Sequence, residues 1–136
     1  MKKPVIILLA LMMILLSACG AASQTATEAP KSTAYTQISS SKAMEMMEKE
    51  QNYIILDVRT QEEYKSGHIP NAICVPNETI GSADIPELPD KDQMILVYCR
   101  SGRRSKEAAQ KLADMGYTNI VEFGGIIDWT GETVTE

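Results

Sequence analysis

The sequence of residues 94–105 is MILVYCRSGRRS, and it joins a strand, a loop and the start of a helix. Residues 94–98 are apolar, and a helical spacing of Ala and Leu follows over residues 105–115. Cys99 is therefore expected at the carboxyl end of a strand, where a glycine-containing basic loop turns back to a helix N-terminus. The unpaired amides and the positive dipole end of that helix can stabilise an anionic sulfur. We expect Cys99 to react as a thiolate; the alternative is a buried structural cysteine beside a solvated basic turn.

Short apolar runs alternate with amphipathic segments on both sides of this stretch, which is typical of an α/β domain. Candidate strands cover residues 35–38, 53–58, 72–75, 94–98 and 119–123. Candidate helices run over residues 40–50, 60–66 and 105–115. Ser40 or Ser41 is expected to cap the first of these helices. Asp57, Cys99 and Gly124 then fall at the carboxyl ends of strands, where open α/β sheets bind ligands.

Four motifs occur in order along the chain. Residues 99–105 have the pattern Cys-x-x-Gly-x-Arg-Ser, and the others are LDVR at 56–59, GHIPNAI at 67–73 and GGIIDW at 124–129. Together they resemble the signatures of single-domain rhodaneses, which are sulfurtransferases, over residues 35–129. The resemblance implies a rhodanese-like α/β fold, with a parallel five-stranded sheet and helices on both faces.

The resemblance also implies a site and a reaction. Cys99 would attack the outer sulfur of an anionic donor and carry it as a persulfide. The loop that binds donor and persulfide would consist of Arg100, Ser101, Gly102, Arg103, Arg104 and Ser105. Asp57 and Arg59 would support the pocket as a structural ion pair. Basic loops in this family go with thiosulfate, so thiosulfate or a similar donor is expected, with cyanide or a thiol, including one on a protein, as acceptor.

Two other functions share this architecture. Cysteine phosphatases and arsenate reductases of the rhodanese-like fold carry five residues between cysteine and arginine, whereas four residues separate Cys99 from Arg104. A shorter loop makes a smaller cradle, which favours sulfur over a phosphoryl group. The third hypothesis is a tethered sulfur-carrier or binding module that is not an enzyme.

Cysteine and histidine are scarce in this chain, which has three of the former and one of the latter. Because there is no Cys-x-x-Cys motif and too few ligands for a tetrahedral zinc site, we expect no metal and no cofactor. His68 is expected to pack and to form hydrogen bonds rather than to act as a base. Cys74 is expected to be a small buried hydrophobe, and Trp129 to close a small core.

The N-terminus has the features of a targeting segment. Residues 1–18 contain two early lysines and then an unbroken apolar run, as in a signal peptide. Leu-Ser-Ala-Cys at its end resembles a bacterial lipobox, which implies lipidation of Cys19; an ordinary secretory signal is the alternative. Residues 19–34 are small and polar and predict a flexible tether, and residues 35–136 suffice for one small domain. We therefore expect an extracytoplasmic protein that is lipid-anchored to a bacterial membrane.

Charge is distributed unevenly along the chain. The formal net charge is −5, and without residues 1–18, which contain two lysines and no acid, 11 basic and 18 acidic residues give −7. An acidic body argues against nucleic acid as a partner. Four of the 11 basic residues lie in or beside the cysteine loop, which indicates a small anionic ligand at that place.

Overall fold

A computed structural model describes residues 34–136 of the chain. The predicted signal peptide, Cys19 and the predicted tether up to residue 33 lie outside the described residues. The domain predicted for residues 35–136 lies within them.

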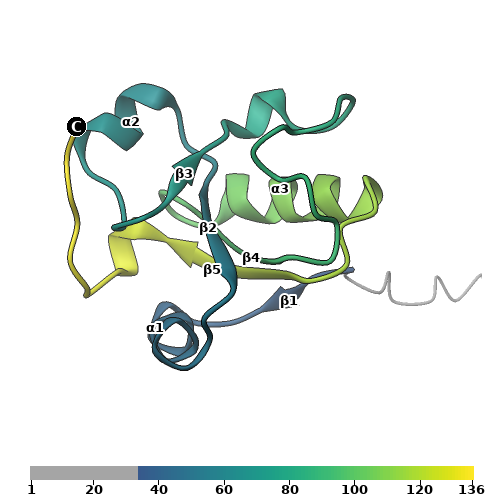
Figure 1. The fold of residues 1–136 in the computed structure, drawn as a ribbon. Coiled ribbons are helices and arrows are strands. Elements are labelled where there is room, and N and C mark those ends of the chain that lie inside the picture. Colours follow the sequence, from purple (N-terminus) through teal and green to yellow (C-terminus); the bar gives the residue numbers. More distant parts are fainter. Residues whose placement is uncertain (1–33) are drawn as a thin grey trace, which may run out of the picture. The chain divides into compact units, whose positions relative to one another are not determined.

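A five-stranded sheet forms the centre of the described part, as Figure 1 shows. Its strands are β1 (Thr36–Gln37), β2 (Tyr53–Asp57), β3 (Ile73–Cys74), β4 (Met94–Cys99) and β5 (Ile120–Gly125). The strand order is β1-β5-β4-β2-β3, and every neighbouring pair is parallel. The middle strand, β4, is buried from Ile95 to Cys99, as expected for a strand covered on both faces. The predicted parallel five-stranded sheet is confirmed.

Three helices connect the strands: α1 (Ser40–Lys49), α2 (Gln61–Ser66) and α3 (Arg103–Asp114). Two short 3₁₀ turns, η1 (Asn77–Thr79) and η2 (Ile126–Asp128), complete the fold. A capping box opens α2, where the Thr60 side chain and the Glu63 side chain each accept the other residue's backbone N–H.

Two helix starts differ from the sequence prediction. Ser39, rather than Ser40 or Ser41, caps α1, because its side chain accepts the Lys42 amide. Helix α3 begins at Arg103, two residues before the predicted start. Gly102 has a φ of 105° and is the N-cap, so the end of the loop already forms the first turn of the helix.

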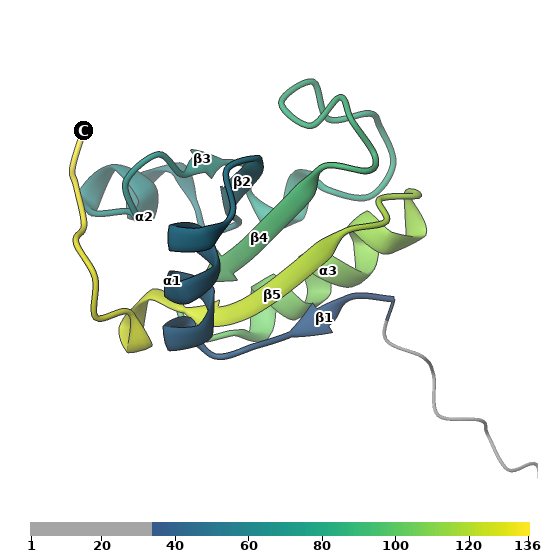
Figure 2. The same cartoon turned by 60° about the horizontal axis from the view of Figure 1, so that its bottom comes forward.

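Helices cover both faces of the sheet, and Figure 2 shows α1 and α3 on opposite sides of it. The face toward α3 buries an apolar cluster that includes Leu56, Ile95, Val97, Cys99, Ala108 and Leu112. The face toward α1 and α2 buries a second cluster that includes Ala43, Ile55, Tyr64, Leu96, Tyr98 and Phe123. The alternation of side chains along β4 and β5 therefore decides which residues lie beneath the first turn of α3.

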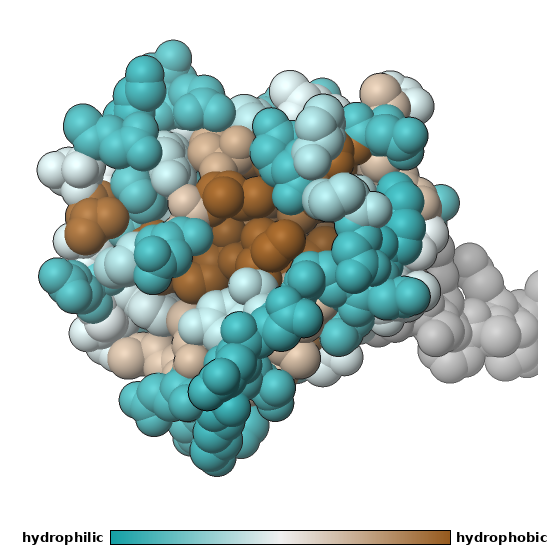
Figure 3. Space-filling model, in the orientation of Figure 1, coloured by the Kyte–Doolittle hydropathy of each residue, from teal (hydrophilic) through white to brown (hydrophobic). Residues whose placement is uncertain are grey.

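Apolar side chains also gather in a hollow on the surface, visible at the centre of Figure 3. A cavity of about 260 Å³ has Met44, Met47, Tyr53, Ile55, Ile69 and Trp129 among its lining residues. Ile55 and Ile69 belong to the cluster on the α1 face, whereas Cys99 packs on the α3 face. This cavity is thus separate from the cysteine loop. None of the helices within residues 34–136 has the length and apolar character needed to cross a bilayer.

Candidate active site

Cys99 lies at the end of β4, as the sequence predicts, and its register partner on β5 is Gly125. The residue is only 1 % exposed. The Gly102 backbone N–H donates to the Cys99 Sγ over 3.0 Å, and the Ser105 Oγ lies 3.4 Å from the same sulfur. A backbone amide and a hydroxyl therefore face the sulfur from the loop and from the first turn of α3.

Glycines allow the loop to close over the sulfur. Gly102 has a positive φ that side-chain-bearing residues rarely adopt. Gly125 has no room for a side chain, because an added Cβ would lie 2.0 Å from the Arg100 carbonyl oxygen. The same carbonyl accepts the Ile127 amide over 3.2 Å. The end of β5 and η2 thus hold the first residue of the loop in place.

The loop arginines have different surroundings. Arg100 and Arg103 are exposed, as is Ser101. The Arg103 side chain forms an exposed ion pair with Glu107 at 2.8 Å. Arg104 is instead largely buried, with 17 % of its side chain exposed, and pairs with Glu63 of α2. Arg100 and Arg103 therefore lie at the surface of the loop, whereas Arg104 holds the loop against α2.

The Arg104–Glu63 pair uses both oxygens of the carboxylate, at 2.7 and 2.8 Å. The hydrogen bond from Arg104 and the Thr60 amide hold the pKa of Glu63 at about 2, although burial acts in the opposite direction. Hydrogen bonding to Glu63 likewise raises the pKa of Arg104. A bidentate contact of this kind fixes the orientation of the guanidinium and also keeps it paired with a negative charge.

A buried acid lies beneath the loop. Glu122 of β5 is 2 % exposed, and its Oε1 accepts the Ser105 hydroxyl at 2.6 Å and the Gly124 amide at 2.8 Å. Among residues 34–136, no lysine or arginine forms an ion pair with this carboxylate. Ser105, which is fully buried, therefore lies between Cys99 and a carboxylate that has no cationic partner in this part of the chain.

The predicted ion pair of Asp57 and Arg59 is present and buried, with an N–O distance of 2.6 Å. The Tyr98 hydroxyl donates to Asp57 over 2.7 Å, and the Arg59 guanidinium donates to the Gly67 carbonyl over 2.7 Å. Burial, with the Asp57 charge, raises the pKa of Tyr98. The pair connects β2, β4 and the turn after α2, which is a structural arrangement.

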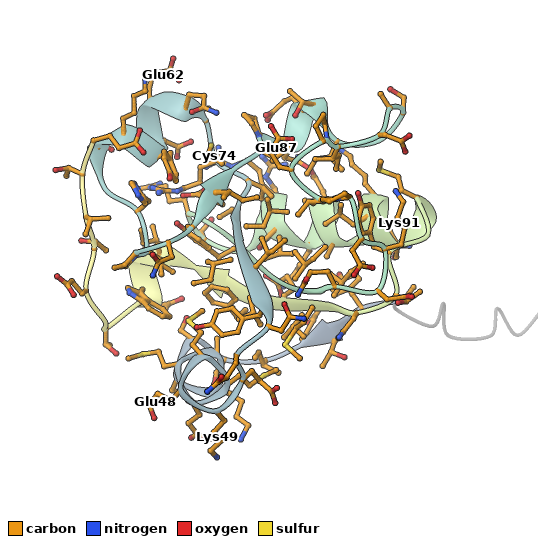
Figure 4. The ribbon with its side chains drawn as sticks, viewed as in Figure 1. Glu48, Lys49, Glu62, Cys74, Glu87 and Lys91 are labelled. Atoms are coloured by element: carbon orange, nitrogen blue, oxygen red, sulfur yellow. The ribbon has the colours of Figure 1, made fainter. Side chains whose placement is uncertain are left out.

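Three further residues lie away from the cysteine loop. His68 is buried, stacks on Tyr64 at a ring separation of 3.7 Å and hydrogen-bonds the Tyr64 carbonyl through Nδ1. Trp129 lies beside Phe123 on the α1 side, with 6.0 Å between ring centres. Cys74 is half-buried on the edge strand β3, where Figure 4 labels it. Within residues 34–136, no group of three His, Cys, Asp or Glu is arranged to hold a metal ion.

Sequence reasoning misses two partners of the loop. Glu63 lies outside the four motifs, and its contact with Arg104 spans 41 residues of sequence. Glu122 belongs to none of the four motifs, although one acid inside the apolar run Ile-Val-Glu-Phe at 120–123 is a detectable signal. Buried carboxylates are uncommon unless they are paired.

The chemistry available at this site is that of a sulfur anion. The Gly102 amide and the positive end of α3 stabilise negative charge on Cys99 or on a sulfur attached to it. The exposed arginines add positive charge at the surface of the loop. Such a site can form and hold a covalent adduct on sulfur.

Several known proteins are similar to this chain. A family model described as a rhodanese-like domain matches residues 39–132. The thiosulfate sulfurtransferase PspE of Escherichia coli is 37% identical over 73 residues, which cover 54% of this chain and 70% of that protein. The thiosulfate sulfurtransferase GlpE of Coxiella burnetii is 34% identical over 96 residues, which cover 70% of this chain and 87% of that protein. A solved structure of a rhodanese with anions from E. coli has a TM-score of 0.57 and 33% identity, covering 62% of this chain and 99% of that chain.

Proposed function

Because the chain belongs to the rhodanese family, we propose that it is a sulfurtransferase that uses thiosulfate or a similar anionic donor. The single observation that carries this proposal is the position of the Cys99 sulfur, which faces the Gly102 amide at the N-terminus of α3. The acceptor would be cyanide or a thiol, which can belong to a protein. Relatives named thiosulfate sulfurtransferases support the choice of donor.

The first half-reaction forms a persulfide. The Cys99 thiolate attacks the outer sulfur of thiosulfate, a new S–S bond forms, and sulfite leaves with the electron pair of the broken bond. The loop amide and the dipole of α3 stabilise the terminal sulfur anion, because both direct positive charge at it. Arg100 and Arg103 attract the doubly charged donor to the loop.

The second half-reaction returns the cysteine to its starting state. Cyanide or a thiolate attacks the terminal sulfur of the persulfide, and the electron pair of the S–S bond returns to the Cys99 Sγ. The product is thiocyanate or a new persulfide on the acceptor. The overall transfer is thereby divided into two steps, each of which exchanges one anion for another.

Intact mass measurement of the full chain tests the proposal. Incubation with thiosulfate should add the mass of one sulfur atom, and cyanide should remove it as thiocyanate. Cys99→Ser should abolish the gain, whereas Cys74→Ser should retain it as the matched control. If both substitutions abolished the gain, a redox cycle between two cysteines would be the better model.

The same preparation distinguishes the phosphatase alternative. The four-residue spacing between Cys99 and Arg104 should give sulfur transfer without useful hydrolysis of aryl phosphates. Robust phosphatase turnover without a persulfide on Cys99 would overturn the assignment. Persulfide formation without turnover on cyanide or small thiols would instead favour a tethered sulfur carrier.

The cell location is a second part of the proposal. The Leu-Ser-Ala-Cys motif after the apolar run supports a lipid anchor on Cys19, outside the cytoplasm of a bacterium. The wild-type protein should incorporate a labelled fatty acid and partition with membranes. Cys19→Ala should lose both properties, and equal labelling of the two proteins would contradict the lipid anchor.

A further inference from the structure

Cys99, Ser105 and Glu122 form a continuous chain of hydrogen-bonding groups. The Cys99 Sγ lies 3.4 Å from the Ser105 Oγ, and this oxygen lies 2.6 Å from the Glu122 Oε1. All three residues are at most 2 % exposed. The shortest contact of the Ser105 hydroxyl is with Glu122, so its proton points to the carboxylate and its lone pairs remain available to the thiol.

We propose that Glu122 takes up the proton of the Cys99 thiol through Ser105 when the cysteine receives sulfur. This inference rests on the proposed function and adds a residue to its mechanism. Glu122 is a positioning and proton-accepting residue in this role, because it acts on the sulfur through Ser105 and does not touch the donor.

The proton transfer balances the charge of the sulfur transfer. The thiol proton moves from Sγ to the Ser105 oxygen as the Ser105 proton moves to Glu122. The Sγ electron pair then forms the bond to the outer sulfur of thiosulfate, and sulfite leaves with its pair. A neutral thiol and an anionic carboxylate become an anionic persulfide and a neutral carboxyl group, so the total charge of the buried site does not change.

The surroundings of Glu122 explain why negative charge should pass from its carboxylate to the sulfur rather than be present on both. Its neighbours in the sheet are Val97 on β4 and Gln37 on β1, neither of which is charged. The first turn of α3 contributes Ser105, and the Arg104 charge acts on Cys99 while its guanidinium is bound by Glu63. Two anions in contact through one hydroxyl would repel strongly in such a buried site.

Infrared difference spectroscopy of the full chain during loading with thiosulfate tests this inference. At about pH 8, exposed carboxyl groups are ionised. A carbonyl band of a protonated carboxyl group should therefore appear as the persulfide forms, and it should shift in D₂O. Glu122→Gln should lack the band, whereas Glu50→Gln, at an exposed position after α1, should keep it. Glutamate labelled with ¹³C in its carboxyl group should shift the band in the wild-type protein, which tests the assignment without any substitution.

The outcomes separate the two proposals. A gain of sulfur mass without the band, or a band that persists in Glu122→Gln, would overturn the role of Glu122 and leave the sulfurtransferase proposal intact. Failure of Cys99 to gain sulfur would overturn the proposed function, and this inference with it. Persulfide formation with a band that depends on Glu122 would establish the proton transfer.

Discussion

Cys99 and Cys74 are both free cysteines at the carboxyl ends of parallel strands, but their surroundings differ in polarity. The sulfur of Cys99 accepts a hydrogen bond from the Gly102 amide and is almost completely buried. The sulfur of Cys74 is more exposed, yet it lies 3.6 Å from the Arg59 carbonyl, a group that can only accept. Burial, together with the negative charge of Asp57, raises the pKa of Cys74 to about 11.

Exposure alone does not distinguish the two cysteines, because the groups that face each sulfur also differ. The segment after each strand produces the difference. A loop and the N-terminus of α3 come after β4, which leaves amides free to face the sulfur. After β3, the Val75 amide donates to Asp57 and the Asn77 amide donates to Val58. Those amides already bind the neighbouring strand and the residue after it.

The substitution Gly125→Ala should have the largest effect, because it displaces the Cys99 loop. The added Cβ would lie 2.0 Å from the Arg100 carbonyl, so the loop must shift away from β5. We expect the free energy of unfolding to fall by about 3 kcal/mol, in the upper range for overpacking. We expect the displaced loop to raise the barrier to sulfur uptake by a similar amount, which lowers the rate of uptake by roughly 150-fold. The rate of mass gain with thiosulfate and the free energy of unfolding measure the two effects.

Gly116→Ala is the matched control for this substitution. Gly116 has a positive φ of 94° but nothing within 4 Å of an added Cβ, so alanine introduces backbone strain without a collision. We expect a loss of about 1 kcal/mol and near-normal sulfur uptake. Equal loss of uptake in both variants would show that general destabilisation, rather than the shape of the loop, is responsible.

The thiol of Cys74 gives the second test. A shift of its pKa from 9.0 to about 11 leaves roughly 100-fold less thiolate near neutral pH. In the Cys99→Ser variant, Cys74 should therefore react with iodoacetamide about 100-fold more slowly in the native protein than in urea. Because the pKa is raised, the native rate should increase about tenfold per pH unit until about pH 11.

Mass spectrometry of peptides separates the reaction of Cys74 from that of Cys19. If Cys74 reacted with iodoacetamide equally fast in the native protein and in urea at neutral pH, the raised pKa of its thiol would be contradicted. A fast native reaction would also make Cys74 a candidate partner thiol for Cys99.

The third test concerns the ion pair that holds the loop against α2. Removing the acid with Glu63→Gln should destabilise the protein by about 2 kcal/mol at pH 7, less than the full shift of its pKa implies because the pair is partly exposed. The pKa of Glu63 is lowered to about 2, so its contribution is complete above the ordinary glutamate range and disappears as the pH falls toward 2. Urea unfolding at pH 7 and pH 3 should show the difference between variant and wild type shrinking.

Glu62→Gln is the control for the Glu63 substitution. Glu62 occupies the same turn of α2, and Figure 4 shows it pointing outward from the helix. Glu62→Gln should lower the free energy of unfolding by less than about 0.5 kcal/mol at both pH values. A Glu62 effect as large as that of Glu63 would point to the charge of the first turn rather than to Arg104.

The positions of the main strands could be predicted from the sequence because β2, β4 and β5 are short, largely apolar runs with clear ends. Residues 94–98 and the loop after them identify Cys99 without knowledge of its neighbours. The length of α3 was less predictable, because Arg103 and Arg104 carry no apolar spacing and the helix start depends on the φ of Gly102.

The partners of the site were harder to predict because they come from distant segments. The Arg104–Glu63 contact depends on α2 packing beside the loop, and the Ser105–Glu122 contact depends on the register of β5. Local sequence patterns determine which face of a strand a residue occupies, but not which side chain from another element meets it.

The smallest expected effect sharpens the role of surface charge at the Cys99 loop. Arg100→Gln should raise the apparent KM for thiosulfate about fivefold with kcat nearly unchanged, since an exposed cation mainly assists the approach and binding of an anion. Arg103→Gln should have a smaller effect, because Glu107 already neutralises part of its charge at 2.8 Å. Both effects should shrink at about 0.5 M salt, where exposed charges are screened. Steady-state thiosulfate:cyanide kinetics at low and high salt measure this. A fall in kcat at constant KM would show instead that Arg100 acts on the reacting sulfur, as the Gly102 amide is inferred to do.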